Sequence, residues 1–432
     1  MKPSFTIRNP KATTVLVWTL RVMLGAVFVF SGFAKTVDPW GTMYKFGEYF
    51  SAWGMDIPRE ISLILGSSLS VFELALGAML LLGCFRRVAA WLTAGFMAAM
   101  TLLTVYIYFK DPVSDCGCFG DALVISNGAT LLKNIILCVP AFFILTLNTK
   151  ASGLVKMKLQ WLAAIVVIAY GAGLAFIGYH VQPLIDFRPF PVGYNIAPVQ
   201  TQPVDMKGMR FVYERDGERR EFDADDIPED DSWTFVERIE PESATLSSDF
   251  VINDEEGDDV TSDVIPEHGK TLLMLISDPR VVGLSRSHSA DKFAEAMSDS
   301  DGNFAVVVAA DYPGGSEAWS ERVHADNYEV YQAEDTDLKM LARGDIALVY
   351  IVDGNIAWKY NAYHFAPDFS DRCVAKPALL DEVRPVYEEY SLLTWTLWTV
   401  AVLLLIIATG PILRLLRPGK TKKPAKETVE VK

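Results

Sequence analysis

Six apolar runs, each long enough to cross a lipid bilayer, constrain this 432-residue chain more than any other feature. A membrane-spanning helix needs about 20 mostly apolar residues. Within a bilayer, every backbone N–H and C=O group must be satisfied inside the protein, so such runs form helices. The sequence therefore predicts a multi-pass α-helical membrane protein, with a four-helix bundle, two further spans and the lipid bilayer as a partner. The runs are residues 13–33, 61–83, 88–109, 129–147, 159–179 and 392–415.

Charge is distributed unevenly between these runs and the rest of the chain. Between Val181 and Tyr390 there are 18 Lys and Arg against 44 Asp and Glu, whereas the remainder has 21 basic and 10 acidic residues. This hydrophilic segment predicts a folded domain outside the membrane. Its acidity argues against nucleic acid as a partner, because nucleic-acid binding needs a basic surface.

Basic residues near the ends of the spans indicate their orientation. All four groups fall on one side if the spans alternate, and the positive-inside rule makes that side cytoplasmic. We therefore expect a bacterial inner (plasma) membrane protein with both termini in the cytoplasm and the acidic domain in the periplasm. The groups are Lys2, Arg8 and Lys11; Arg86 and Arg87; Lys150, Lys156 and Lys158; and Arg414, Arg417, Lys420, Lys422, Lys423 and Lys426.

A short polar loop between the third and fourth spans carries two cysteines, Cys116 and Cys118, on either side of Gly117. The expected topology places this loop in an oxidising compartment, where disulfides form. A disulfide between such close cysteines is strained, and strained disulfides are the labile ones suited to exchange. Cys116 and Cys118 are therefore the candidate catalytic redox pair. Asp115 and Asp121 are expected to disfavour the thiolate through their charge.

Two ionisable residues lie inside the predicted spans. Arg21 is about 12 Å and Glu73 about 15 Å from the cytoplasmic ends of their helices, at about 1.5 Å per residue. A charge at this depth is costly unless it is paired, so we expect an Arg21–Glu73 ion pair. The pair could simply join two helices, or it could line a site for a quinone head group or a proton path. Lys35, at the outer end of the first span, is expected to extend to the interface.

The acidic segment separates into two parts. Residues 181–268 begin with a proline-rich connector and continue as a small β-rich unit, with a hairpin turn expected at Asp216-Gly217. Residues 269–390 alternate strands and helices and end in a hairpin and a helix over 379–390, which indicates an α/β domain.

The order of elements in residues 269–390 resembles a thioredoxin-like domain. The Cys-x-x-Cys motif of a thioredoxin would follow the first strand, where this chain has Asp278-Pro279-Arg280. We therefore expect a redox-inactive module, and we expect its single thiol, Cys373, to be a buried small residue. The chain is therefore expected to have five segments. Residues 1–150 form the four-span domain, 151–180 the fifth span, 181–268 the connector and β-rich unit, 269–390 the thioredoxin-like domain, and 391–432 the sixth span with a basic tail. No cysteine or histidine cluster has metal-ligand spacing, so no metal site is predicted.

The first 150 residues resemble the DoxX-like and methylamine-utilisation MauE membrane proteins, in a Bacteroidetes-type arrangement with an added outward domain. Three stretches carry the resemblance: residues 20–38, residues 72–83, and Asp115 to Asp121 with its Cys-Gly-Cys-Phe-Gly core. MauE relatives are implicated in maturing a disulfide-rich periplasmic dehydrogenase, and DoxX relatives in quinone-dependent oxidation. The resemblance therefore implies a redox-associated membrane protein, with a quinone as a candidate cofactor.

Two functions follow from these observations. In the first, Cys116 and Cys118 exchange disulfides with periplasmic client proteins. In the second, the protein is a non-enzymatic envelope assembly or scaffolding protein, and the two cysteines form a structural disulfide that holds the loop.

Overall fold

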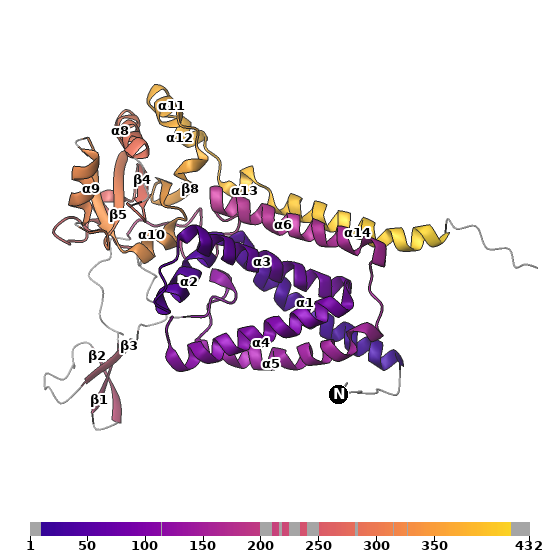
Figure 1. Cartoon of the computed structure of the whole chain (residues 1–432). Helices are drawn as coiled ribbons and strands as arrows, with labels where there is room; N and C mark the ends of the chain where they lie inside the picture. Colours follow the sequence, from indigo (N-terminus) through magenta and orange to yellow (C-terminus); the bar gives the residue numbers. More distant parts are fainter. Residues whose placement is uncertain are drawn as a thin grey trace, which may run out of the picture. The chain divides into compact units, whose positions relative to one another are not determined.

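The computed structural model describes residues 10–113, 115–198, 210–215, 218–223, 234–239, 250–280, 284–313, 315–325 and 327–415. The expected turn at Asp216-Gly217, the basic residues Lys2 and Arg8, and the basic tail beyond residue 415 lie outside these ranges. The chain forms two compact units (Figure 1). The first comprises Met1–Tyr179, Pro183–Ile185 and Tyr390–Lys432, and the second comprises His180–Gln182 and Asp186–Glu389.

The first unit is helical. Six helices in the described part of the chain are long and apolar enough to cross a membrane, which confirms a multi-pass membrane protein. A shorter helix, α2 (Pro39–Ala52), lies between the first two of them, and the Asp38 side chain caps it by accepting from the Gly41 N–H at 3.0 Å. The six are α1 (Pro10–Val37), α3 (Arg59–Leu82), α4 (Arg86–Lys110), α5 (Asn127–Leu147), α6 (Gln160–His180) and α14 (Leu392–Leu415).

Small residues set the register between α1 and α3. A Cβ atom on Gly32 would lie 2.3 Å from the backbone nitrogen of Leu74, and one on Gly77 would lie 2.6 Å from that of Val29. Glycine is needed here because only the absence of a side chain lets the two backbones approach this closely. This close contact brings the C-terminal half of α1 against the middle of α3.

The second unit contains two sheets. β1 (Arg210–Arg215), β2 (Glu218–Asp223) and β3 (Thr234–Ile239) form an antiparallel sheet in the order β2-β1-β3, as expected of a small β-rich unit. The larger sheet has the order β6-β5-β4-β7-β8, with β4, β5 and β6 parallel and β7 and β8 antiparallel. Its strands are β4 (Lys270–Ile276), β5 (Asn303–Ala309), β6 (Glu329–Ala333), β7 (Ile346–Val352) and β8 (Asn355–Asn361).

Helices accompany the larger sheet, and together they make a mixed α/β domain compatible with a thioredoxin-like fold (Figure 1). The single helix expected over 379–390 is instead two short ones, because Pro385 disfavours helical geometry in the residue before it. The helices are α7 (Thr261–Val264), α8 (Leu284–Ser298), α9 (Gly315–Val323), α10 (Asp335–Leu341), α11 (Phe369–Ala375), α12 (Leu379–Glu382) and α13 (Val386–Glu389). Helix α11 was not predicted from the sequence; it contains Cys373, which is fully buried.

A buried charge cluster joins the connector to the larger sheet. Asp186 accepts hydrogen bonds from Arg188 Nε at 2.7 Å and Arg188 Nη2 at 2.8 Å, and from Lys359 Nζ at 2.5 Å. Burial opposes ionisation of Asp186, but the charges of Arg188 and Lys359 prevail and lower its pKa to about 2. The cluster therefore ties residues 186–190 to strand β8 through charge-assisted hydrogen bonds.

Candidate dithiol site in the membrane unit

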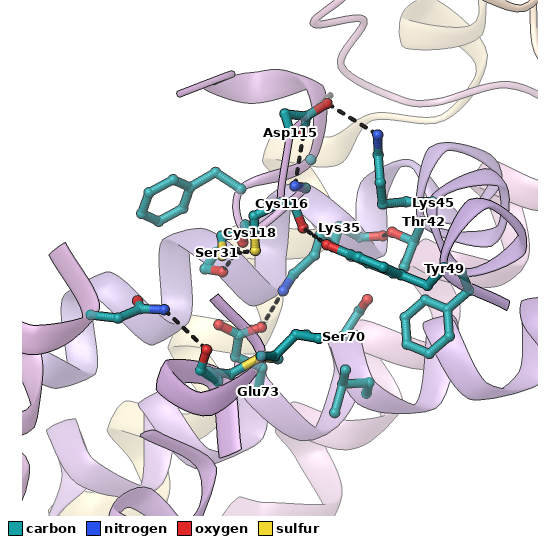
Figure 2. Close-up of a pocket in the computed structure, with 18 of the residues that line it drawn as sticks. Ser31, Lys35, Thr42, Lys45, Tyr49, Ser70, Glu73, Asp115, Cys116 and Cys118 are labelled. Carbon is teal, nitrogen blue, oxygen red and sulfur yellow. Dashed lines mark hydrogen bonds and ion pairs between the residues drawn. The ribbon is translucent and has the colours of Figure 1, made fainter. Parts of the chain in front are cut away.

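Helices α1 to α5 and the loop between α4 and α5 enclose a cavity of about 170 Å³. Most of its wall is apolar or aromatic, and polar side chains gather near the cysteine loop (Figure 2). The lining includes Phe28, Ser31, Lys35, Lys45, Phe46, Tyr49, Ser70, Glu73, Phe96, Leu103, Cys116, Cys118, Lys133 and Asn134. The structure thus brings Cys116, Cys118, Lys35 and Glu73 into one site.

The two thiols face each other at the wall of this cavity. The Sγ atoms of Cys116 and Cys118 are 3.0 Å apart, which is hydrogen-bond distance between two thiols. Gly117 between them has φ +64°, in the left-handed region that glycine adopts freely. A Cβ atom there would also lie 2.8 Å from Lys45 Cγ. The glycine is therefore what allows the turn that directs both thiols to the same point.

Hydrogen bonds from neighbouring helices hold the cysteine loop in place. The hydroxyl of Tyr49 on α2 donates to the carbonyl oxygen of Cys116 at 2.8 Å, and that of Ser31 on α1 donates to the carbonyl oxygen of Cys118 at 2.5 Å. Asp115 accepts from the Gly117 N–H at 2.7 Å and from Lys45 Nζ at 3.0 Å (Figure 2). These bonds fix the loop against two helices, so the thiols are presented in a defined geometry.

The surroundings shift the pKa values of the two thiols in opposite directions. The hydrogen bond from Cys116 lowers the pKa of Cys118, and the positive charges of Lys133 and Lys35 reinforce this against the opposing effect of burial. The same hydrogen bond raises the pKa of Cys116. We expected Asp115 and Asp121 to disfavour a thiolate, but Asp115 is engaged by Lys45 and by the loop backbone. Cys118 is therefore the thiol that ionises more readily, as an attacking thiol requires.

Glu73 pairs with Lys35, which differs from the expected partner. The Lys35 ammonium donates to Glu73 Oε2, and the two side chains are only 8% and 7% exposed. Lys35 therefore turns inward to the cavity instead of extending outward to an interface. The pairing follows from the register of α1 on α3, which sets the C-terminal part of α1 beside Glu73.

Arg21 does not reach Glu73, so the expected Arg21–Glu73 pair is wrong. Its guanidinium donates to the Asn148 side chain at 2.6 Å and to the carbonyl oxygens of Asn148 and Ser152 at 2.8 and 2.9 Å. Asn148 directly follows the last residue of α5, where helix carbonyls lack partners and attract a cation, and Ser152 lies in the segment beyond it. Measuring depth from each helix end misplaced Arg21, because α1 extends past the end of α3 and Arg21 lies opposite Gly83.

Several residues of the site were not predicted from the sequence. Lys45 and Tyr49 lie on α2, whose aromatic residues indicate an interfacial helix as readily as a site wall. Lys133 Nζ lies over the ring of Phe119, 4.1 Å from the ring centroid. In the sequence, Lys133 looked like an isolated charge at the end of a span. No cluster of His, Cys, Asp and Glu suited to a metal is present among the described residues.

Together, the helical unit and the dithiol cavity define a class: a multi-pass membrane protein with paired cysteines at a cavity between its helices. Residues 13–147 match the family model for methylamine utilisation protein MauE. The matched region contains α2 to α5, the cysteine loop and nearly all of α1. Residues 208–241 match a domain of unknown function, DUF8463. No curated protein and no solved structure matches the chain.

The difference between the thiols predicts a pH-dependent alkylation. Iodoacetamide reacts with the thiolate, so Cys118 should be modified at a pH below the range of an ordinary thiol, and Cys116 should resist. Replacing Cys116 with alanine removes the hydrogen bond that is the main cause of the lowered pKa of Cys118. The pH midpoint for alkylation of Cys118 should therefore rise. Peptide mass spectrometry after timed alkylation measures both rates. Equal rates at the two cysteines across the pH range would contradict the assignment.

Proposed function

We propose that this protein exchanges disulfides with client proteins through Cys116 and Cys118 and so assists the maturation of proteins outside the cytoplasm. The observation that carries the proposal is the pair of thiols 3.0 Å apart in a glycine turn, with the more ionisable one beside two lysines. A thiolate next to a second thiol is the arrangement that exchange requires. The basic flanks of the spans support a bacterial inner-membrane location with this loop and the second unit in the periplasm.

The exchange uses the two cysteines in sequence. The Cys118 thiolate attacks one sulfur of a client disulfide, forming a mixed disulfide and releasing the other client sulfur as a thiolate. Cys116 then loses its proton to water and attacks Cys118 Sγ, which closes the Cys116–Cys118 disulfide and releases the second client thiolate. The client gains two electrons and the protein loses two. Run in reverse, the same steps donate a disulfide to a client dithiol.

A second function, envelope assembly without catalysis, rests on the second unit. Its sheet resembles that of a thioredoxin, but Asp278-Pro279-Arg280 follows strand β4 where a reactive cysteine pair would lie. Such a fold can bind a partner without chemistry. In that case the Cys116–Cys118 disulfide would be structural.

Thiol trapping separates these functions. In the Cys116→Ser variant the mixed disulfide cannot be resolved, so a client should remain attached to Cys118 and appear on non-reducing gels. The Cys118→Ser variant should trap several-fold less. Cys138→Ser, which alters a half-buried thiol on α5, is the matched control and should trap nothing. Full complementation by both loop variants, with no trapped client, would overturn the exchange function and favour assembly.

A further inference from the structure

Strand β6 forms one edge of the larger sheet, and a polar groove of the second unit lies beside it. We infer that this edge receives an extended, positively charged segment of a partner protein, which adds to the sheet as a further strand. The inference goes beyond disulfide exchange and does not depend on it, because the residues that line the groove all belong to the second unit.

The backbone groups of β6 point alternately toward β5 and toward the outer edge. Ala333 faces β5, because its carbonyl oxygen accepts from the Ala310 N–H at 2.8 Å. Gln332 faces outward and exchanges two hydrogen bonds with Asn253, at 2.8 and 3.0 Å, so Val330, two residues earlier, faces outward as well. Within the described part of the chain, no hydrogen bond engages the main chain of Val330 on that side. An edge with unpaired backbone groups is a template for another strand.

The chain that pairs with β6 leaves the edge where the groove begins. After Asn253 it turns back on itself, and the Asp254 N–H donates to the carbonyl oxygen of Asp258 at 3.0 Å. A strand that continued straight on from Asn253 would lie beside Val330, which instead lines a groove of about 640 Å³. This volume lies within the roughly 300–1,000 Å³ of ligand pockets, so the groove has room for a short length of peptide.

The charge of the groove indicates the chemistry of the partner. Its lining includes three exposed carboxylates, those of Glu255, Asp263 and Glu329, and none of its described lining residues is Lys or Arg. Burial and the charges of Glu329 and Asp263 raise the pKa of the Tyr331 hydroxyl, so negative potential extends along β6. A segment with Lys or Arg complements this edge, whereas a second copy of the edge would bring like charges together.

Strand addition would combine two kinds of contact. Main-chain hydrogen bonds to Val330 supply affinity and require only that the segment be extended. Side chains alternate along a strand, so every second residue of the segment would point to the same face of the sheet, and basic residues there would reach the carboxylates. The partner is therefore defined by an extended conformation and positive charge.

A peptide titration on the full chain tests the inference. The protein would be held in phosphatidylcholine nanodiscs, which carry no net charge, and the probe is a fluorescent peptide of alternating lysine and valine. Its anisotropy should rise saturably at low ionic strength and decline as salt is added. Val330→Pro removes the outward N–H and should abolish binding, while proline is tolerated at a sheet edge. Replacing the three carboxylates, in Glu255→Gln/Asp263→Asn/Glu329→Gln, should weaken binding by about tenfold.

Matched controls separate this edge from the general acidity of the unit. Glu388→Gln/Asp368→Asn neutralises two exposed carboxylates that do not line the groove, and it should bind the peptide as tightly as the parent. A peptide of alternating lysine and proline keeps the positive charge but cannot form a regular strand, so it should not bind. A peptide of alternating glutamate and valine should not bind either, because its charge has the wrong sign.

Several results would overturn the inference. These are the absence of saturable binding by the parent, binding that Val330→Pro leaves unchanged, and equal binding of the lysine–proline peptide. An equal loss in the control variant and in the triple variant would show that the groove does not select the peptide. Concentration-dependent association of the parent that Val330→Pro abolishes would assign the edge to a second copy of the chain instead. If Val330→Pro does not fold, the triple variant and the lysine–proline peptide provide the test.

Discussion

Replacing Lys35 with methionine is expected to destabilise the membrane unit by about 3–5 kcal/mol, because it leaves the buried Glu73 carboxylate without its counter-ion. Glu73→Leu should have a comparable effect through an unpaired Lys35. The double variant Lys35→Met/Glu73→Leu should recover most of the loss, since no buried charge then remains. Unfolding in mixed micelles, followed by circular dichroism, measures all three against the parent.

Lys45→Met is the matched control for this cycle. Lys45 also forms ion pairs, with Glu48 and Asp115, but these partners are 48% and 22% exposed and remain in contact with solvent. Its loss should therefore cost at most about 1 kcal/mol. A double variant as unstable as the sum of the two single ones would show that Lys35 and Glu73 do not stabilise each other.

Gly32→Ala should have the second large effect, on the contact between α1 and α3. The added Cβ would meet the Leu74 backbone at 2.3 Å, so the helices must separate or shift. Overpacking of this kind costs about 1–3 kcal/mol, and backbone atoms cannot move aside as a flexible side chain can. Because α1 and α3 carry Lys35 and Glu73, the variant should also disturb the site, seen as a changed alkylation rate at Cys118.

Gly95→Ala provides the comparison within the same unit. Gly95 lies in α4 with open space around its Cα, so alanine meets no atom within 4 Å. There the substitution should be neutral or stabilising by up to about 1 kcal/mol, because alanine favours the helix more than glycine does. Equal losses at Gly32 and Gly95 would mean that close approach does not explain the glycine at 32.

Much of the fold followed from local patterns along the chain. The spans were predictable because each apolar run is continuous, and a bilayer accepts such runs only as helices. The strands and most helices of the second unit were predictable because apolar residues recur with short periods between turn signals. The break at Pro385 was a local signal that the sequence reading did not use, and α11 has no strong apolar period to mark it.

The site was only partly predictable. Cys116 and Cys118 were found because two cysteines one residue apart in a loop are a strong local signal. The partners of Arg21 and Glu73 were not predictable, because the position of a residue along its own helix does not give the axial offset between that helix and its neighbour. Lys45, Tyr49 and Lys133 were missed for the same reason. Each lies on a helix, and its contact with the cysteine loop depends on how that helix packs.

The sequence by itself determined that this is a multi-pass membrane protein with an acidic α/β domain, and that Cys116 and Cys118 are its one closely spaced thiol pair. Hydrophobic runs and residue spacing are local properties, so they survive without knowledge of how the chain packs. Only the tertiary structure decided that Lys35 is the partner of Glu73, that Arg21 binds the end of α5, and that a cavity lies beside the thiols. Those outcomes depend on the register of α1 against α3, which is set by close backbone contact at small residues and is not a property of either helix alone.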